Sequence, residues 1–146
     1  MNKRTIEQEL DTTGRILRTT IGTSMEPMLK ERQNIVILEK AEDILKKYDI
    51  ALYRRPNGQY VLHRVIKVRE NDYIICGDNL WKKEIVPHKW VIAYATGYYK
   101  NGRLISLDNK KYQKYIKTLW IRRKKLWIKA KTRALIKRIK RLFNEK

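Results

Sequence analysis

Cysteine, long apolar runs and an export signal are the main absences in this sequence of 146 residues. Its single cysteine, Cys76, excludes an internal disulfide and is too few for a cysteine-based zinc site. No run of about 18 apolar residues occurs, and the charged N-terminus lacks the apolar segment of a signal peptide. We therefore expect a soluble, cytoplasmic protein without a membrane-spanning helix, a metal or a cofactor. Cys76 ends an apolar run and is expected to be a buried strand residue.

Acidic residues are nearly absent from the last quarter of the chain. Residues 109–146 hold 16 Lys or Arg and a single acid, Glu145, so they carry +15 of the total charge of +20. Residues 1–108 are closer to balance, at +5. Together with the sequence patterns below, this distribution predicts an N-terminal segment at 1–13, a body at 14–108 and a basic tail over the remainder.

The body combines β-rich runs with regularly spaced turn signals. Val, Ile and Tyr are frequent in the runs, and "PNG" and "KNG" separate pairs of them as hairpin turns do. We expect about seven short strands in a mainly β, small, curled and mostly antiparallel domain. A short helix is expected at 4–12, and a helix or a turn at 41–48. The expected strands are at 15–21, 33–39, 49–55, 59–68, 72–76, 90–99 and 103–107.

The tail contains neither Gly nor Pro from Lys110 onward, which favours a helix. Trp120 and Trp127 lie beside an apolar stripe, and Lys and Arg occupy the opposite face. Packing of the stripe on the β-body is the simplest outcome. Among partners, the Trp residues and the charge favour an anionic membrane surface, at the inner face of the membrane, over nucleic acid or an acidic peptide. The stripe recurs every seven residues, at Ile121, Ile128, Leu135 and Leu142.

One serine stands at a rigid corner of the chain. Ser24 lies in "GTSMEPML", where the proline fixes its own φ and restricts the residue before it. A serine hydroxyl becomes nucleophilic when a base accepts its proton, and the chain has two histidines. His63 lies in an alternating strand pattern and His88 in a Pro-containing loop, so His63 is the better candidate. Asp78 and Glu84 follow closely enough to orient an imidazole, although Asp78 alone is typical of a turn.

Three short blocks together resemble signal peptidase I and its self-cleaving relatives, the LexA-like serine peptidases. They are "GTSMEPML", "YDIALYRRPNGQYVLHRVIKV" and "DYIICGDN", and their order and spacing agree with the family over the body. The "HRV" that begins at His63 resembles the histidine type of the endoplasmic reticulum and archaea, whereas other members use a lysine. The resemblance implies Ser24 as nucleophile, His63 as general base, Glu84 as the third member and Asp78 as a local organiser of the site.

Several positions depart from the family pattern. Gly22 stands where many relatives have an oxyanion-stabilising hydroxyl, which leaves the backbone N–H of the serine, with Thr23 as a substitute, to stabilise the oxyanion. Glu84 replaces the usual Asp, and Tyr48 stands where a Gly is usual. Met25 is expected to help shape shallow pockets for small side chains of the substrate.

The sequence leaves three functions open. The leading hypothesis is a soluble serine endopeptidase that removes a leader or signal-like segment from a peptide or protein precursor, because the family's membrane-spanning anchor is missing. The alternative is a LexA-like regulatory protein that binds nucleic acid through the basic tail and cleaves no other substrate. A third is a non-catalytic binding module on a decayed peptidase body, against which the intact serine, histidine and acid argue.

Overall fold

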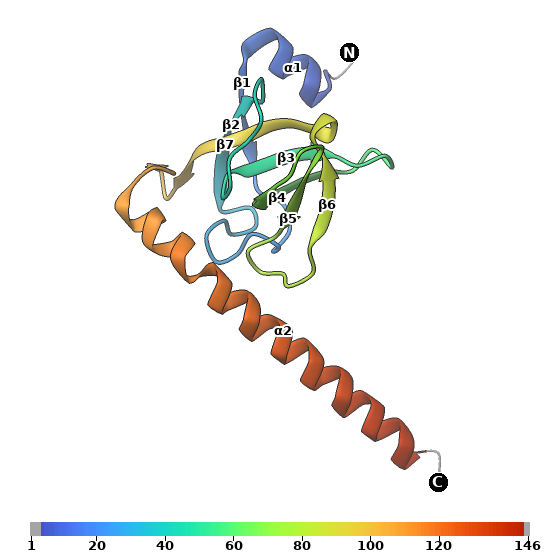
Figure 1. The fold of residues 1–146 in the computed structure, drawn as a ribbon. Helices are drawn as coiled ribbons and strands as arrows, with labels where there is room; N and C mark the ends of the chain where they lie inside the picture. Colours follow the sequence, from blue (N-terminus) through green and yellow to red (C-terminus); the bar gives the residue numbers. More distant parts are fainter. Residues whose placement is uncertain (1–3, 145–146) are drawn as a thin grey trace.

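The computed structural model describes residues 4–144, so the first three residues of the expected N-terminal segment and the last two of the tail lie outside the described residues. Within that range, eight strands form one curled antiparallel sheet that does not close into a barrel, and a helix precedes and follows it (Figure 1). The strand order is β1-β2-β7-β3-β4-β5-β6, with β8 paired to β7. The elements are α1 (Ile6–Thr13), β1 (Arg15–Thr19), β2 (Asn34–Lys40), β3 (Ile50–Arg54), β4 (Tyr60–Val68), β5 (Asp72–Cys76), β6 (Glu84–Pro87), a 3-10 turn (His88–Trp90), β7 (Val91–Lys100), β8 (Arg103–Ser106) and α2 (Lys110–Asn144).

The sheet confirms the expected mainly β, antiparallel body, and the local sequence explains its boundaries. The "PNG" turn joins β3 to β4, with Gly58 at φ 85°. Asn101 and Gly102 join β7 to β8 at φ 50° and 73°, the pattern of a two-residue hairpin turn with both central residues left-handed. At the start of α1, Thr5 and Gln8 form a reciprocal capping box, which satisfies N–H groups that the helix leaves free.

One segment differs from what the sequence predicts, and another adopts one of two predicted alternatives. An eighth strand, β6, pairs with β5 where a Pro-containing loop is expected, and its proline is tolerated because it ends an edge strand. Residues 41–48 contain no helix and end in a turn, the other expected alternative. This segment is held by Leu45, which is buried and whose backbone N–H donates to the Tyr73 hydroxyl at 2.8 Å.

Strand β3 and the middle of β4 are buried on both faces, and His63 lies in this buried stretch. In β3, the first four of five residues are buried. β4 pairs with it so that His63 lies opposite Ala51. Buried side chains gather in two clusters, one around Leu10, Ile16, Leu29, Leu38 and Ile50 and one around Tyr53, Val65, Tyr73, Ile75 and Val86.

α2 divides into a part that packs on the β-body and a longer part that extends beyond it (Figure 1). Ile116 and Leu119 are its buried residues. Of the alternatives that the sequence leaves open for the stripe, packing on the β-body does not occur, because Ile121, Ile128 and Leu135 are all exposed. In the described part of the chain, every helix is too short or too polar to cross a bilayer.

Candidate active site

The structure brings Ser24 and His63 together, although 39 positions separate them in the sequence. Ser24 lies in a turn closed by a 3.1 Å hydrogen bond from the Glu26 N–H to the Thr23 carbonyl, and His63 projects from β4. The distance from Ser24 Oγ to His63 Nε2 is 3.0 Å, within hydrogen-bond range. The imidazole is only 6% exposed, whereas Ser24 is partly open to solvent. This is the contact through which a base accepts a hydroxyl proton.

The serine loop (residues 20–33) is held in place by the loop that follows β5. Asn79 donates its backbone N–H to the Ser24 carbonyl at 2.8 Å and its side-chain amide to the Thr23 carbonyl at 3.2 Å. Gly77 permits this approach, since a Cβ there would lie 2.6 Å from the Ser24 carbonyl oxygen and 3.2 Å from His63 Nε2. The "GDN" block therefore needs glycine for proximity and asparagine for hydrogen bonding.

Nδ1 of His63 faces a hydroxyl and a carboxylate at nearly equal distances. Tyr53 Oη lies 3.4 Å away and Glu84 Oε1 3.5 Å away, both longer than a good hydrogen bond. The Tyr53 hydroxyl donates to the same Glu84 oxygen at 2.9 Å. Arg55 donates to both carboxylate oxygens, at 2.5 and 3.1 Å. Glu84 is thus the acid that the structure places beside Nδ1, and Tyr53 and Arg55 fix its position.

Burial and hydrogen bonding set the charges of this network. Burial lowers the pKa of His63 below its ordinary value, and the Glu84 carboxylate offsets only part of the effect. Burial alone would raise the pKa of Glu84, but hydrogen bonds from Arg55 and Tyr53 outweigh it and lower that pKa. At neutral pH, His63 is therefore in the neutral form that accepts a proton, and Glu84 is ionised.

Asp78 pairs with Arg64 and not with His63. The side chains of Asp78 and Arg64 are fully buried, and Arg64 donates from Nε and Nη2 to the two carboxylate oxygens, each at 2.7 Å. Arg64 also donates to the Tyr48 carbonyl at 3.0 Å and to Met28 Sδ at 3.4 Å. One bidentate ion pair therefore joins the serine loop, the segment before β3, strand β4 and the loop after β5. The contacting residues of these four segments lie within the three sequence blocks "GTSMEPML", "YDIALYRRPNGQYVLHRVIKV" and "DYIICGDN".

The first turns of α2 complete the Asp78 network. The Tyr115 hydroxyl donates to Asp78 Oδ2 at 2.9 Å, and the Tyr112 hydroxyl accepts from the paired arginine at 2.5 Å. Arg122 donates to the Asp78 carbonyl at 3.2 Å and to the Asn79 side-chain oxygen at 3.1 Å. Burial and the neighbouring carboxylate raise the pKa of Tyr115, so its hydroxyl remains a donor. α2 is thus bound to the loop that holds the serine.

Three other expected site positions have different surroundings. Thr23 is exposed, and its carbonyl accepts hydrogen bonds. Met25 is buried and belongs to the core beneath the serine loop, and its role in shaping a shallow substrate pocket stays a prediction. Gly22 has φ 81°, a left-handed conformation that disfavours any side chain and explains the absence of a hydroxyl residue there. The Ser24 N–H finds no acceptor among residues 4–144, which leaves it available to an oxyanion.

Sequence reasoning missed Tyr53, Arg55, Arg64 and Tyr115. A signal existed for Tyr53: the "PNG" turn sets a register in which it lies two residues from Ala51, the partner of His63, and therefore on the same face. The arginine of "HRV" occupies a strand interior, where a charge requires a buried partner, and the aspartate of "GDN" supplies it. Tyr115 carries no comparable signal, because the docking of α2 is a tertiary event.

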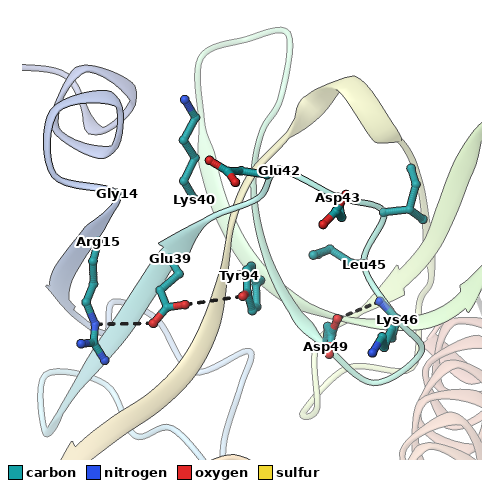
Figure 2. A pocket seen from close by; sticks show the side chains of 11 residues that line it. Gly14, Arg15, Glu39, Lys40, Glu42, Asp43, Leu45, Lys46, Asp49 and Tyr94 are labelled. Atoms are coloured by element: carbon teal, nitrogen blue, oxygen red, sulfur yellow. Dashed lines mark hydrogen bonds and ion pairs between the residues drawn. The ribbon is translucent and has the colours of Figure 1, made fainter.

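A second group of polar side chains surrounds a separate cavity of about 580 Å³ (Figure 2). Glu39 accepts from the Tyr94 hydroxyl at 3.5 Å and lies 3.7 Å from Arg15, and Asp49 accepts from the Lys46 N–H at 2.7 Å. Its acids are therefore partly engaged within the protein, and Ser24 and His63 do not line it. The lining residues are Gly14, Arg15, Glu39, Lys40, Glu42, Asp43, Ile44, Leu45, Lys46, Asp49 and Tyr94.

The other candidate residues carry structural roles. His88 packs against Tyr73 with 4.3 Å between ring centroids and the rings tilted by 46°, and burial raises the pKa of the Cys76 thiol. Among residues 4–144, no three His, Cys, Asp or Glu side chains gather as a metal ion would require. No protein-family model and no curated protein sequence matches the chain. The site is therefore defined by its own geometry.

Proposed function

We propose that the chain is a serine endopeptidase of the Ser–His type that removes a leader or signal-like segment from a peptide or protein precursor. The observation that carries the proposal is the 3.0 Å contact between Ser24 Oγ and the Nε2 of a buried, neutral His63. The Glu84 carboxylate beside Nδ1 supports it, because it stabilises the imidazolium that forms when the serine proton is transferred. The substrate class rests on the resemblance of the three sequence blocks to signal peptidases.

In this mechanism the serine is acylated and then released. Ser24 Oγ attacks a peptide carbonyl carbon while His63 Nε2 accepts the hydroxyl proton, and the negative charge moves to the carbonyl oxygen. The Ser24 backbone N–H donates to that oxygen, a type of contact worth about 3 kcal/mol. The imidazolium gives its proton to the leaving amine as the C–N bond breaks. Water, deprotonated by His63, then releases the acid from the acyl-enzyme.

The rim of the site supports an apolar substrate segment. Ile21 lies three residues before the serine, and Leu80 and Trp81 follow the loop that holds it; all three are exposed. Exposed apolar groups in the loops that carry and hold a nucleophile favour an extended, apolar stretch of chain over a charged one. This property agrees with a signal-like segment.

The experiment is active-site acylation with a fluorophosphonate probe, located by peptide mass spectrometry. The chain offers matched controls, because it has two serines, Ser24 and Ser106, and two histidines, His63 and His88. We expect Ser24→Ala to abolish labelling and His63→Ala to slow it about a thousandfold or more, since such groups act as one unit. Ser106→Ala and His88→Ala should label at the wild-type rate.

The same variants are then tested on a library of fluorogenic peptides with apolar stretches followed by small residues. Cleavage that requires both Ser24 and His63 would support the peptidase. A folded protein that is neither labelled nor active would support the non-catalytic module instead. Labelling of His63→Ala at the wild-type rate would remove the base from the mechanism.

A further inference from the structure

The outer part of α2 exposes a continuous apolar face. Besides Trp127, seven large apolar side chains between positions 121 and 143 are each 41% to 77% exposed. A patch of this length is unusual on the surface of a monomer and marks an interaction surface. We refer to it as the outer stripe, which consists of Ile121, Ile128, Leu135, Ile136, Ile139, Leu142 and Phe143.

The outer stripe lies on the side of α2 that is turned away from the β-body. Residues of an α-helix are about 100° apart around the axis. Ile121 is therefore about 200° from Leu119, which is buried against the body, and Ile128, seven residues further, keeps nearly the same direction. The helix also extends beyond the sheet (Figure 1), so no described element covers the stripe.

A second copy of the chain fits this face poorly. A two-stranded coiled coil needs apolar residues at both positions a and d of each heptad. If Ile121, Ile128 and Leu135 are taken as a positions, the d positions are Lys124, Lys131 and Arg138; if they are taken as d positions, the a positions between them are Lys125 and Thr132. Either register therefore places charged or polar side chains at the second seam position over these heptads. The 15 Lys and Arg of α2, which has no Asp or Glu, add repulsion between two such helices.

A nucleic acid would use only half of the helix. Its phosphates would contact Lys and Arg, and the outer stripe would stay in water. A bilayer uses both features, because the apolar face enters the acyl boundary and the basic residues contact anionic headgroups. Trp120 and Trp127 are exposed beside the stripe, and indole rings prefer the interface between headgroups and acyl chains.

We propose that the outer part of α2 lies flat on an anionic bilayer, with the outer stripe inserted and the basic residues at the headgroups. The contacts of Tyr115 and Arg122 with the loop after β5 continue from this helix to the serine loop. Bilayer binding therefore tethers the β-body and its serine loop to the water side of the lipid surface. The lipid binding itself does not depend on the proposed peptidase activity.

The test is cosedimentation of the full chain with vesicles of phosphatidylcholine mixed with phosphatidylglycerol, and with vesicles of phosphatidylcholine alone. The stripe variant is Ile128→Ala with Leu135→Ala, and the charge variant is Arg133→Ala with Lys137→Ala. Alanine preserves helix propensity in both, and all four side chains are exposed, so the body stays folded. Ser24→Ala serves as a control that should bind like the wild type.

We expect binding to the anionic vesicles and little to the others. The stripe variant should lose at least about tenfold in affinity at low and at high salt, because its loss is apolar area. The charge variant should lose about fivefold per charge at low salt and less at high salt, where charges are screened.

Equal binding of the wild type and the stripe variant would overturn the proposal. So would a dimer in sedimentation equilibrium that the stripe substitutions dissociate, without any vesicle binding. Binding of a single-stranded RNA in place of vesicles, unchanged in the stripe variant, would also overturn it and assign the helix to nucleic acid.

Discussion

Asp78 and Glu84 are each bound by an arginine and a tyrosine, yet their environments differ. Asp78 and Arg64 have no exposed side-chain surface, whereas Glu84 and Arg55 are 31% and 30% exposed. Water can replace a lost partner at the half-exposed pair but not at the buried one. The buried network therefore holds loops together, and the half-exposed network can respond to the charge of His63. Within one site, Asp78 thus serves the arrangement of the loops, and Glu84 serves the charge of the histidine.

The largest expected effect comes from converting each acid to its amide. Asp78→Asn leaves the Arg64 charge buried without a counter-charge, and breaking such a pair costs about 3–5 kcal/mol of unfolding free energy. Glu84→Gln should cost less than about 1 kcal/mol, because its arginine is open to water. Urea denaturation of the two variants measures the difference. Equal losses would mean that the two acids are not distinguished by burial.

The next effect concerns the pH dependence of acylation. Burial lowers the pKa of His63, so the acid limb of the labelling rate should lie below the ordinary histidine value of about 6.5. Glu84→Gln removes a carboxylate that raises this pKa and leaves Arg55, which lowers it. The acid limb should therefore move to still lower pH, while the rate on the plateau falls about tenfold to a hundredfold.

The same pKa shift predicts how stability changes with pH. Folded His63 has a lower pKa than the unfolded residue, so below about pH 6.5 the unfolded chain binds more protons. The contribution of His63 to stability is fully present above that pH and is lost as pH falls through the pKa of the folded state.

For the labelling rate, an acid limb that moves to higher pH in Glu84→Gln would show that Glu84 does not act on His63 through charge.

Local patterns predict the strands, whereas the resemblance of the three sequence blocks implies that Ser24 and His63 act together. Alternation in β4 and the turn before it place His63 on a defined face, and proline and glycine shape the loop around Ser24. Tyr48 stands where glycine is usual in the peptidases that the sequence resembles. Its φ of 77° is left-handed, a conformation that favours glycine, and its carbonyl accepts a hydrogen bond from Arg64.

The sequence predicts α2 itself but not how the helix divides between body and solvent. The seven-residue stripe reads equally well as a face packed on the sheet or as an exposed face. The docking of α2 depends on Tyr112, Tyr115 and Arg122, whose partners in the body lie 37 or more positions away in the chain. Such contacts follow from the path of the whole chain, so no local signal announces them.

The smallest expected effect concerns the contact of α2 with the buried acid Asp78. Tyr115→Phe removes one hydroxyl that donates to Asp78 and leaves both arginine hydrogen bonds to that carboxylate in place. A hydrogen bond to a charged group contributes about 1.5–3 kcal/mol, and we expect the lower end because Asp78 stays paired. The control is Tyr99→Phe, which changes a half-buried tyrosine whose hydroxyl bonds to no residue among 4–144. Thermal unfolding should show a lower Tm for Tyr115→Phe alone, by about 2–6 °C. An equal shift in both variants would assign the loss to general packing, and α2 would then not be tied to the serine site through this hydroxyl.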